Sequence, residues 1–193
     1  MLAANKDERT LSEVPNLTHL VHSAGSATKE KVVSYPAEAF IGVRAIEAKN
    51  GSLVFLRGDW ALRCWFDGKD EKVQEVLWLT GRNAGQISSV PNELALATAP
   101  TVRASIRLSD VTKAKSHYEA TPGTAVVSAV GNIELWGHIM GAGPDSVYGF
   151  TMTGQNVIPP DNVGFVYFDS YEVWLEQEGV TIGESPLFTV NPA

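Results

Sequence analysis

The side chains best placed for acid–base chemistry are Glu134 and His138, within "NIELWGHIM". Residues four apart on a β-strand share a face, so a carboxylate and an imidazole there could serve a hydrolase or isomerase. A hydrogen-bonded histidine in a sheet is the commoner arrangement. The chain has no G-x-S-x-G, H-E-x-x-H, phosphate-loop or dinucleotide-binding motif. We therefore expect that the protein is not an enzyme.

A second cluster consists of carboxylates in the turn sequence "DGKDE", where Asp67, Asp70 and Glu71 lie close together. Calcium takes several oxygen ligands, and carboxylates from two chains can supply them at an interface. The sequence thus predicts Asp67, Asp70 and Glu71 as ligands of Ca²⁺ between subunits. The alternative is a solvated hairpin tip.

A third cluster is basic and contains Arg103, Arg107, Lys113 and Lys115, interrupted by Asp110. In an acidic chain, this is where contacts with RNA phosphates would concentrate. The alternative is a solvent-facing sheet edge protected by charge.

Five tryptophans suggest a further class, a carbohydrate- or ligand-binding β-sandwich module. Trp65 and Trp78 are the candidates for solvent-facing platforms on which sugars stack. Packing in a core or an interface is the commoner fate of tryptophan.

Composition narrows these possibilities. The 193 residues, 44% hydrophobic and 19% charged, fit one globular domain. The net charge of −7 argues against a surface that binds nucleic acid all over. Cys64 is the single cysteine, so an intrachain disulfide and a cysteine-rich zinc site are excluded, and its apolar neighbours predict burial. No apolar run approaches the roughly 20 residues of a membrane span, and "MLAANKDERT" is no signal peptide, so we expect an intracellular origin without a membrane.

The elements that must position these residues are predicted to be strands. Asn50-Gly51 predicts a hairpin joining residues 39–49 to "SLVFLR". In "WALRCWFD", Trp60, Leu62, Cys64 and Phe66 share one face, while Arg63 and Asp67 share the other. In "PTVRASIRL", the apolar Val102, Ala104, Ile106 and Leu108 alternate with Thr101, Arg103, Ser105 and Arg107.

About nine such strands, with turn signals between them, predict an all-β antiparallel sandwich or barrel with one or two short helices. One of those helices is expected within residues 109–120. Residues 1–31 are charge-balanced and predict a flexible N-terminal arm, followed by a domain over residues 32–193 with a C-terminal tail.

The strand near the C-terminus changes character along its length. In "FVYF" the residues that would point to either face of the strand are all apolar, as in a strand covered on both sides. From Tyr171 onward, Tyr171, Val173 and Leu175 alternate with polar neighbours and Trp174, as in a strand with one wet face. Asp169-Ser170 marks the change and is a candidate bulge.

"GFVYFDSYEVWLEQEG" resembles the last strand of the jelly-roll coat proteins of small icosahedral RNA viruses, whose form is Gly–hydrophobic–Tyr–x–Tyr–Glu–Val–x–Leu. The residues that fit this form are Gly164, Val166, Tyr167, Tyr171, Glu172, Val173 and Leu175. "GNIELWGHIMGAG" is similar to the preceding core strand of that family.

The resemblance implies an eight-stranded jelly roll that self-assembles, in many copies, into a capsid enclosing an RNA genome. It also implies a virion protein assembled in the host cytoplasm. One departure concerns the arm, because many relatives carry an arginine-rich arm and this one is charge-balanced. RNA would then be held weakly, through Arg103 and Arg107.

Overall fold

The computed structural model is built almost entirely of strands, and it describes residues 35–67, 72–108, 112–115, 123–127, 132–142, 146–157, 165–168 and 170–190. Contacts divide the chain into Met1–Val32 and Val33–Ala193, and every described residue belongs to the second unit. The predicted arm therefore lies outside the described residues. No described helix is long and apolar enough to cross a membrane.

The strands form two sheets. The larger sheet has twelve strands: β1 (Phe40–Arg44), β2 (Leu53–Leu56), β3 (Asp59–Asp67), β4 (Lys72–Trp78), β5 (Gln86–Ser89), β6 (Leu94–Thr98), β8 (Thr112–Lys115), β9 (Ala125–Val127), β10 (Ile133–Ile139), β11 (Val147–Thr151), β12 (Asn156–Val157) and β13 (Phe165–Phe168). The smaller has four: β7 (Val102–Leu108), β14 (Tyr171–Gln177), β15 (Val180–Ile182) and β16 (Phe188–Val190). Two short 3₁₀ helices are η2 (Ala37–Ala39) and η3 (Ala45–Glu47).

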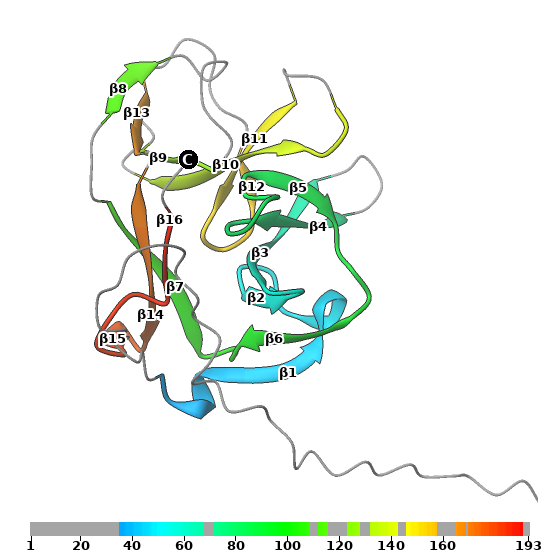
Figure 1. Ribbon diagram of the computed structural model, residues 1–193, viewed down its shortest axis with the longest axis vertical. Helices are drawn as coiled ribbons and strands as arrows, with labels where there is room; N and C mark the ends of the chain where they lie inside the picture. Colours follow the sequence, from blue (N-terminus) through cyan, green and yellow to red (C-terminus); the bar gives the residue numbers. More distant parts are fainter. Residues whose placement is uncertain are drawn as a thin grey trace, which may run out of the picture. The chain divides into compact units, whose positions relative to one another are not determined.

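The larger sheet runs in the order β1-β6-β2-β3-β4-β5-β10-β9-β13-β8, with β11 beside β10 and β12 beside β11 (Figure 1). Its described strand pairs are antiparallel except for β5 with β10, where Gln86 lies opposite His138. In the smaller sheet, β14 pairs with β7 on one edge and with β15 and β16 on the other.

One apolar core joins the two sheets. Leu53, Leu62, Leu77 and Leu135 enter it from the larger sheet, and Val173 enters it from the smaller. Rings also meet across it, because Trp60 of β3 stacks on Phe188 of β16 with centroids 5.8 Å apart. The alternation predicted for both sets of strands is thus confirmed at Leu62 and Cys64, and at Val102 and Ala104.

A second cluster covers the other face of the larger sheet. It contains Val54, Ala61, Val76 and Trp78, with Ala45 and Ala48 packed on them. Arg63 lies on this face and is 1% exposed. Its guanidinium donates to the carbonyl of Glu75 at 2.9 Å, to Oε1 of Gln74 at 2.8 Å and to the carbonyl of Ile46 at 3.4 Å. Arg63 points to the face of β3 that was predicted, but this face is not exposed to solvent, because residues 45–48 fold over it.

The hairpin predicted at Asn50-Gly51 is wrong. β6 lies between β1 and β2, so the strands on either side of this turn do not pair. A two-residue hairpin turn lies instead at Arg57-Gly58, with φ of 56° and 91°, and joins the paired residues Leu56 and Asp59.

Glycine is required at position 51 for a different reason. Its φ is +81°, and a Cβ there would lie 2.8 Å from the carbonyl carbon of Thr153. A Cβ on Gly154 would meet the carbonyl oxygen of Arg63 and, at 2.7 Å, the amide nitrogen of Gly51. The two glycines therefore let two turns of the larger sheet pack backbone to backbone.

The all-β prediction is confirmed, whereas finer features differ. The larger sheet alone exceeds eight strands and contains a parallel pair. The helix expected within residues 109–120 is wrong over Thr112–Lys115, which is strand β8 and pairs with β13. Pairing with a distant strand overrides the local helical pattern there.

The change of character near the C-terminus marks a change of sheet, and the bulge predicted at Asp169-Ser170 includes Asp169, which lies outside the described residues. β13 belongs to the larger sheet and β14 to the smaller. Tyr167 and Phe168 are buried on opposite faces of β13, in different clusters, as a doubly covered strand requires. In β14, Tyr171, Val173 and Leu175 are fully buried, and the residues between them are half-buried.

Candidate functional site

The outer face of the smaller sheet carries alternating charges. We use this name for the residues of β7 and β14 that point away from the core: Arg103, Ser105, Arg107, Glu172, Trp174 and Glu176. Arg103 lies opposite Glu176, Ser105 opposite Trp174, and Arg107 opposite Glu172. A row of arginines therefore runs beside a row of glutamates, and both arginines are exposed.

Trp174 is held at the centre of this face by polar contacts. Its Nε1 donates to Oε2 of Glu172 at 2.8 Å. The guanidinium carbon of Arg107 lies 3.9 Å from the centroid of the Trp174 ring, and Nη2 of Arg107 donates to Oγ1 of Thr181 at 3.0 Å. Arg107 thus crosses from β7 over Trp174 to β15, and its side chain is ordered by both contacts.

A pocket of about 430 Å³ adjoins the outer face and shares Arg103 and Glu176 with it. The two glycine turns at Gly51 and Gly154 bring its other walls together. Its apolar lining comes from Val102, Ala104 and Met152, and its polar lining includes Lys49, Asn50, Ser52 and Thr153. Charges of both signs around an apolar floor suit a small polar molecule or a polar side chain of another protein.

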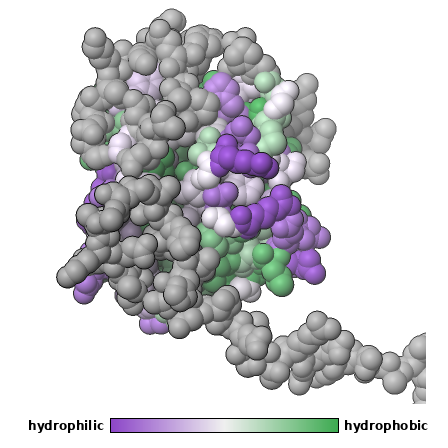
Figure 2. Space-filling model, in the orientation of Figure 1, coloured by the Kyte–Doolittle hydropathy of each residue, from purple (hydrophilic) through white to green (hydrophobic). Residues whose placement is uncertain are grey.

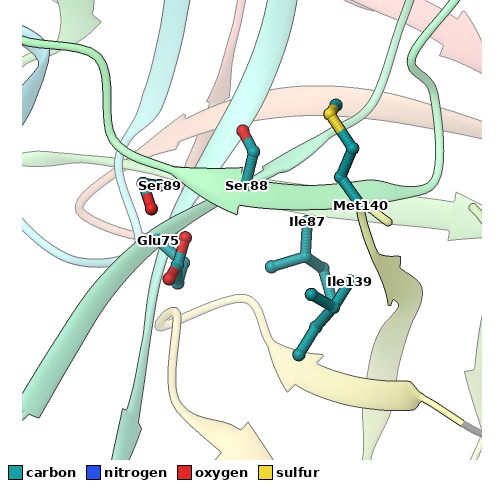
Figure 3. A pocket seen from close by; sticks show the side chains of 6 residues that line it. All are labelled: Glu75, Ile87, Ser88, Ser89, Ile139 and Met140. Atoms are coloured by element: carbon teal, nitrogen blue, oxygen red, sulfur yellow. The ribbon is translucent and has the colours of Figure 1, made fainter. Parts of the chain in front are cut away.

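A smaller pocket, of about 250 Å³, contains Glu75 (Figure 3). Glu75 lies opposite Cys64 on β3 and opposite Ser89 on β5, on the core-facing side of the sheet. Burial raises the pKa of its carboxyl group, and the nearby Arg63 opposes this in part. Its Oε2 is buried and has no hydrogen-bond partner within the part of the chain that the structure describes.

Glu134 and His138 share a face of β10, but they lie too far apart along the strand to hydrogen-bond to each other. Four residues of strand separate their Cα atoms by about 13 Å. Glu134 is 3% exposed and accepts a hydrogen bond from Nε1 of Trp136 at 3.3 Å. Burial raises the pKa of Glu134 and lowers that of His138. The geometry fits polar groups packed beside Trp136.

The predicted basic cluster is distributed over both sheets. Arg103 and Arg107 lie on β7, whereas Lys113 and Lys115 lie on β8 of the larger sheet, where only the backbone is described. Each arginine faces a glutamate across the strands, which reduces the local positive potential. RNA binding by these four residues stays a prediction.

The predicted calcium ligands fall mostly outside the described residues. Asp67 is the last residue of β3, while Asp70 and Glu71 belong to the undescribed turn before β4. Within the described ranges, no three His, Cys, Asp or Glu side chains are grouped so that they could hold a metal ion. The calcium site stays a prediction.

The two tryptophans proposed as sugar platforms differ. Trp78 is 4% exposed and donates from Nε1 to Oγ of Ser88 at 3.0 Å, so the prediction of a solvent-facing platform is wrong for it. Trp65 is half-buried. Cys64 is buried in the core, as predicted, and burial raises the pKa of its thiol.

Exposed apolar side chains define another surface at the β1–β6 edge. Ile41 is 37% exposed, Ile46 49% and Leu94 80%. Figure 2 shows hydrophobic residues gathered where Figure 1 places β1 and β6, beside a hydrophilic area. Among the described strands, β1 pairs with β6 alone.

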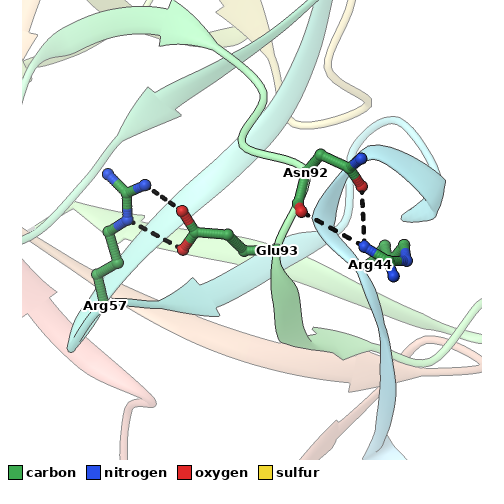
Figure 4. Close-up of polar contacts among 4 residues, drawn as sticks. All are labelled: Arg44, Arg57, Asn92 and Glu93. Atoms are coloured by element: carbon green, nitrogen blue, oxygen red, sulfur yellow. Dashed lines mark hydrogen bonds and ion pairs between the residues drawn. The ribbon is translucent and has the colours of Figure 1, made fainter.

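Polar contacts flank this edge (Figure 4). Arg57 forms a bidentate ion pair with Glu93, and Nη1 of Arg44 donates to Oδ1 of Asn92 at 3.3 Å. These contacts fasten the segment that precedes β6 to β1 and to the β2–β3 turn.

The chain matches no protein-family model, no curated protein and no solved structure. Function is therefore proposed from the residues and their geometry.

Two features of these sites were missed in the sequence. Glu75 alternates with Val73 and Leu77, so period two alone indicates a carboxylate on a core-facing position. The pairing of Arg103 and Arg107 with glutamates needed the register of β7 against β14, for which the sequence carries no local signal.

Proposed function

We propose that this chain is a structural subunit that assembles with copies of itself. The resemblance of the C-terminal strand to viral coat proteins suggests which assembly this is. We propose an icosahedral shell around an RNA genome. It assigns the chain no catalytic role.

The observation that carries the proposal is the charge pattern of the outer face. Consider a two-fold axis parallel to the strands and running between β7 and β14. Two copies related by this axis lay the arginine row of each over the glutamate row of the other. Trp174 lies near the middle of such a contact, where aromatic anchors contribute most to binding. A face that complements itself in this way suits an isologous contact.

A closed shell needs more than one kind of contact. The β1–β6 edge, with Ile41, Ile46 and Leu94 exposed, supplies a second candidate surface of different chemistry. An apolar edge and a charged face together would let one subunit meet several neighbours.

The proposal includes the jelly-roll sandwich. Two sheets facing one core are the feature in common with that architecture, and the strands beyond eight, together with the parallel β5–β10 pair, would be additions to it. RNA would contact the shell weakly, since Arg103 and Arg107 have glutamates opposite them. An experimental structure of assembled particles would test both statements.

The experiment is a charge-swap mixing test by light scattering and electron microscopy. One variant carries Arg103→Glu and Arg107→Glu, and the other carries Glu172→Arg and Glu176→Arg. We expect wild type to associate through the outer face, each variant alone to lose this contact because like charges face one another, and an equimolar mixture to regain it.

Two results would count against the proposal in different ways. A wild-type protein that stays monomeric at high concentration, across pH and with calcium added, would exclude self-assembly. Variants that associate as wild type does would leave self-assembly intact and exclude the outer face as its contact. Thermal melts of both variants show whether each is folded, and Arg82→Glu, at an exposed position in the loop between β4 and β5, is the matched control.

A further inference from the structure

The pocket around Glu75 has the composition of a binding site for a small ligand. It occupies about 250 Å³ and is lined by Glu75, Ile87, Ser88, Ser89, Ile139 and Met140. This volume lies below the about 300–1,000 Å³ of pockets that hold drug-sized molecules, so a small ligand is required. Figure 3 shows Glu75, Ser89, Ile87 and Ile139 on one side of β5, whereas the side chains of Ser88 and Met140 point to the other side.

The carboxylate of Glu75 has unused hydrogen-bonding capacity. Its Oε2 is buried without a partner among the described residues. The hydrogen bonds of the nearby Arg63 run to the Glu75 carbonyl, the Gln74 side chain and the Ile46 carbonyl. Cys64 lies opposite Glu75. Burial raises the pKa of its thiol, so Cys64 is uncharged and does not form an ion pair with the carboxylate. A buried acceptor without a donor costs free energy, which a ligand that brings a donor would recover.

We propose that this pocket binds a small primary amine with an aliphatic body. The ammonium group donates to the Glu75 carboxylate and to the hydroxyl of Ser89, while the aliphatic part lies on Ile87 and Ile139. A primary ammonium has three donors, enough for the carboxylate and the Ser89 hydroxyl, with one left for water. Ser88 takes no part in this site, because its Oγ accepts from Nε1 of Trp78 on the opposite face of the sheet.

The test uses n-butylammonium as the probe and follows backbone amide resonances by NMR during titration. We expect saturable shifts of the amides of residues 75, 87–89 and 139–140. Tetramethylammonium has the charge without an N–H donor, and n-butanol has the aliphatic body without the charge, and each is expected to bind at least tenfold more weakly.

Glu75→Gln is the decisive variant, because it keeps the shape of the side chain and removes its charge. We expect it to fold and to bind n-butylammonium at least tenfold more weakly, while Glu93→Gln, a surface carboxylate elsewhere, binds as wild type does. Ile139→Ala tests the apolar wall and is expected to weaken binding severalfold. Equal affinity of wild type and Glu75→Gln, shifts that do not saturate, or shifts outside the pocket would each overturn the proposal.

Discussion

The guanidinium carbon of Arg107 lies 3.9 Å from the centroid of the Trp174 ring, so a cation from β7 covers an indole from β14. Cation–π contacts at exposed sites contribute about 0.5–1 kcal/mol. We therefore expect Arg107→Gln to lower the free energy of unfolding by about that amount. In a Trp174→Leu background the same substitution should have a smaller effect. A double-mutant cycle by urea denaturation measures the difference, and strict additivity would show that the contact contributes nothing.

The buried carboxyl of Glu134 should make stability depend on pH. Burial raises its pKa in the folded state, so the folded protein favours the protonated form. Its contribution to stability is then complete below the unfolded pKa and is lost as pH rises through the folded pKa. Glu134→Gln keeps an acceptor for Nε1 of Trp136 and removes the titration. We expect it to raise the midpoint of thermal unfolding at neutral pH and to leave it nearly unchanged under acid conditions.

Glu93 should behave in the opposite sense. The hydrogen bond from Arg57 lowers its pKa, so its contribution to stability is present above the unfolded pKa and is lost as pH falls through the folded pKa. Glu93→Gln is therefore expected to be slightly less stable than wild type at neutral pH and equal to it in acid. Thermal melts of the two variants at several pH values should diverge from wild type in opposite directions, and a shared direction would contradict this account.

The contact between the turns at Gly51 and Gly154 should tolerate no side chain. Gly154 has φ of +81°, and a Cβ there would meet the backbone of Arg63 and Gly51. Gly154→Ala combines backbone strain with overpacking, so we expect a loss of about 2–4 kcal/mol. Gly58 has φ of +91° with nothing within 4 Å of its Cβ position, so Gly58→Ala is the matched control and should cost only about 1–2 kcal/mol of strain. Equal losses would show that close approach contributes nothing.

The thiol of Cys64 should be inert in the folded protein. It is buried in the core, and burial raises its pKa, so the reactive thiolate is scarce. We expect an aromatic disulfide reagent to react only at the rate of unfolding, and promptly once urea unfolds the chain. A control with Cys64→Ala and Ile46→Cys, which moves the thiol to an exposed position, should react at once. Prompt reaction of native wild type would contradict the buried position of Cys64.

Local patterns predicted the strands well. Alternation of apolar residues placed Leu62 and Cys64, and likewise Val102 and Ala104, in the core, because a strand with one buried face repeats every two residues. The burial of Arg63 escaped prediction, since residues 45–48 fold over its face and only the fold shows it. The role of Gly51 also escaped prediction. The sequence predicts a hairpin turn there, whereas the positive φ of Gly51 allows a close contact with a distant turn.

The sequence by itself determined that this chain is all-β, that its strands have a definite inner face, and that Cys64 is buried, since each depends on residue type and period two. The tertiary structure alone decided which strands are neighbours, that β13 and β14 lie in different sheets, and that glutamates face Arg103 and Arg107. These depend on pairing between segments far apart in the chain, for which neighbouring residues carry no information.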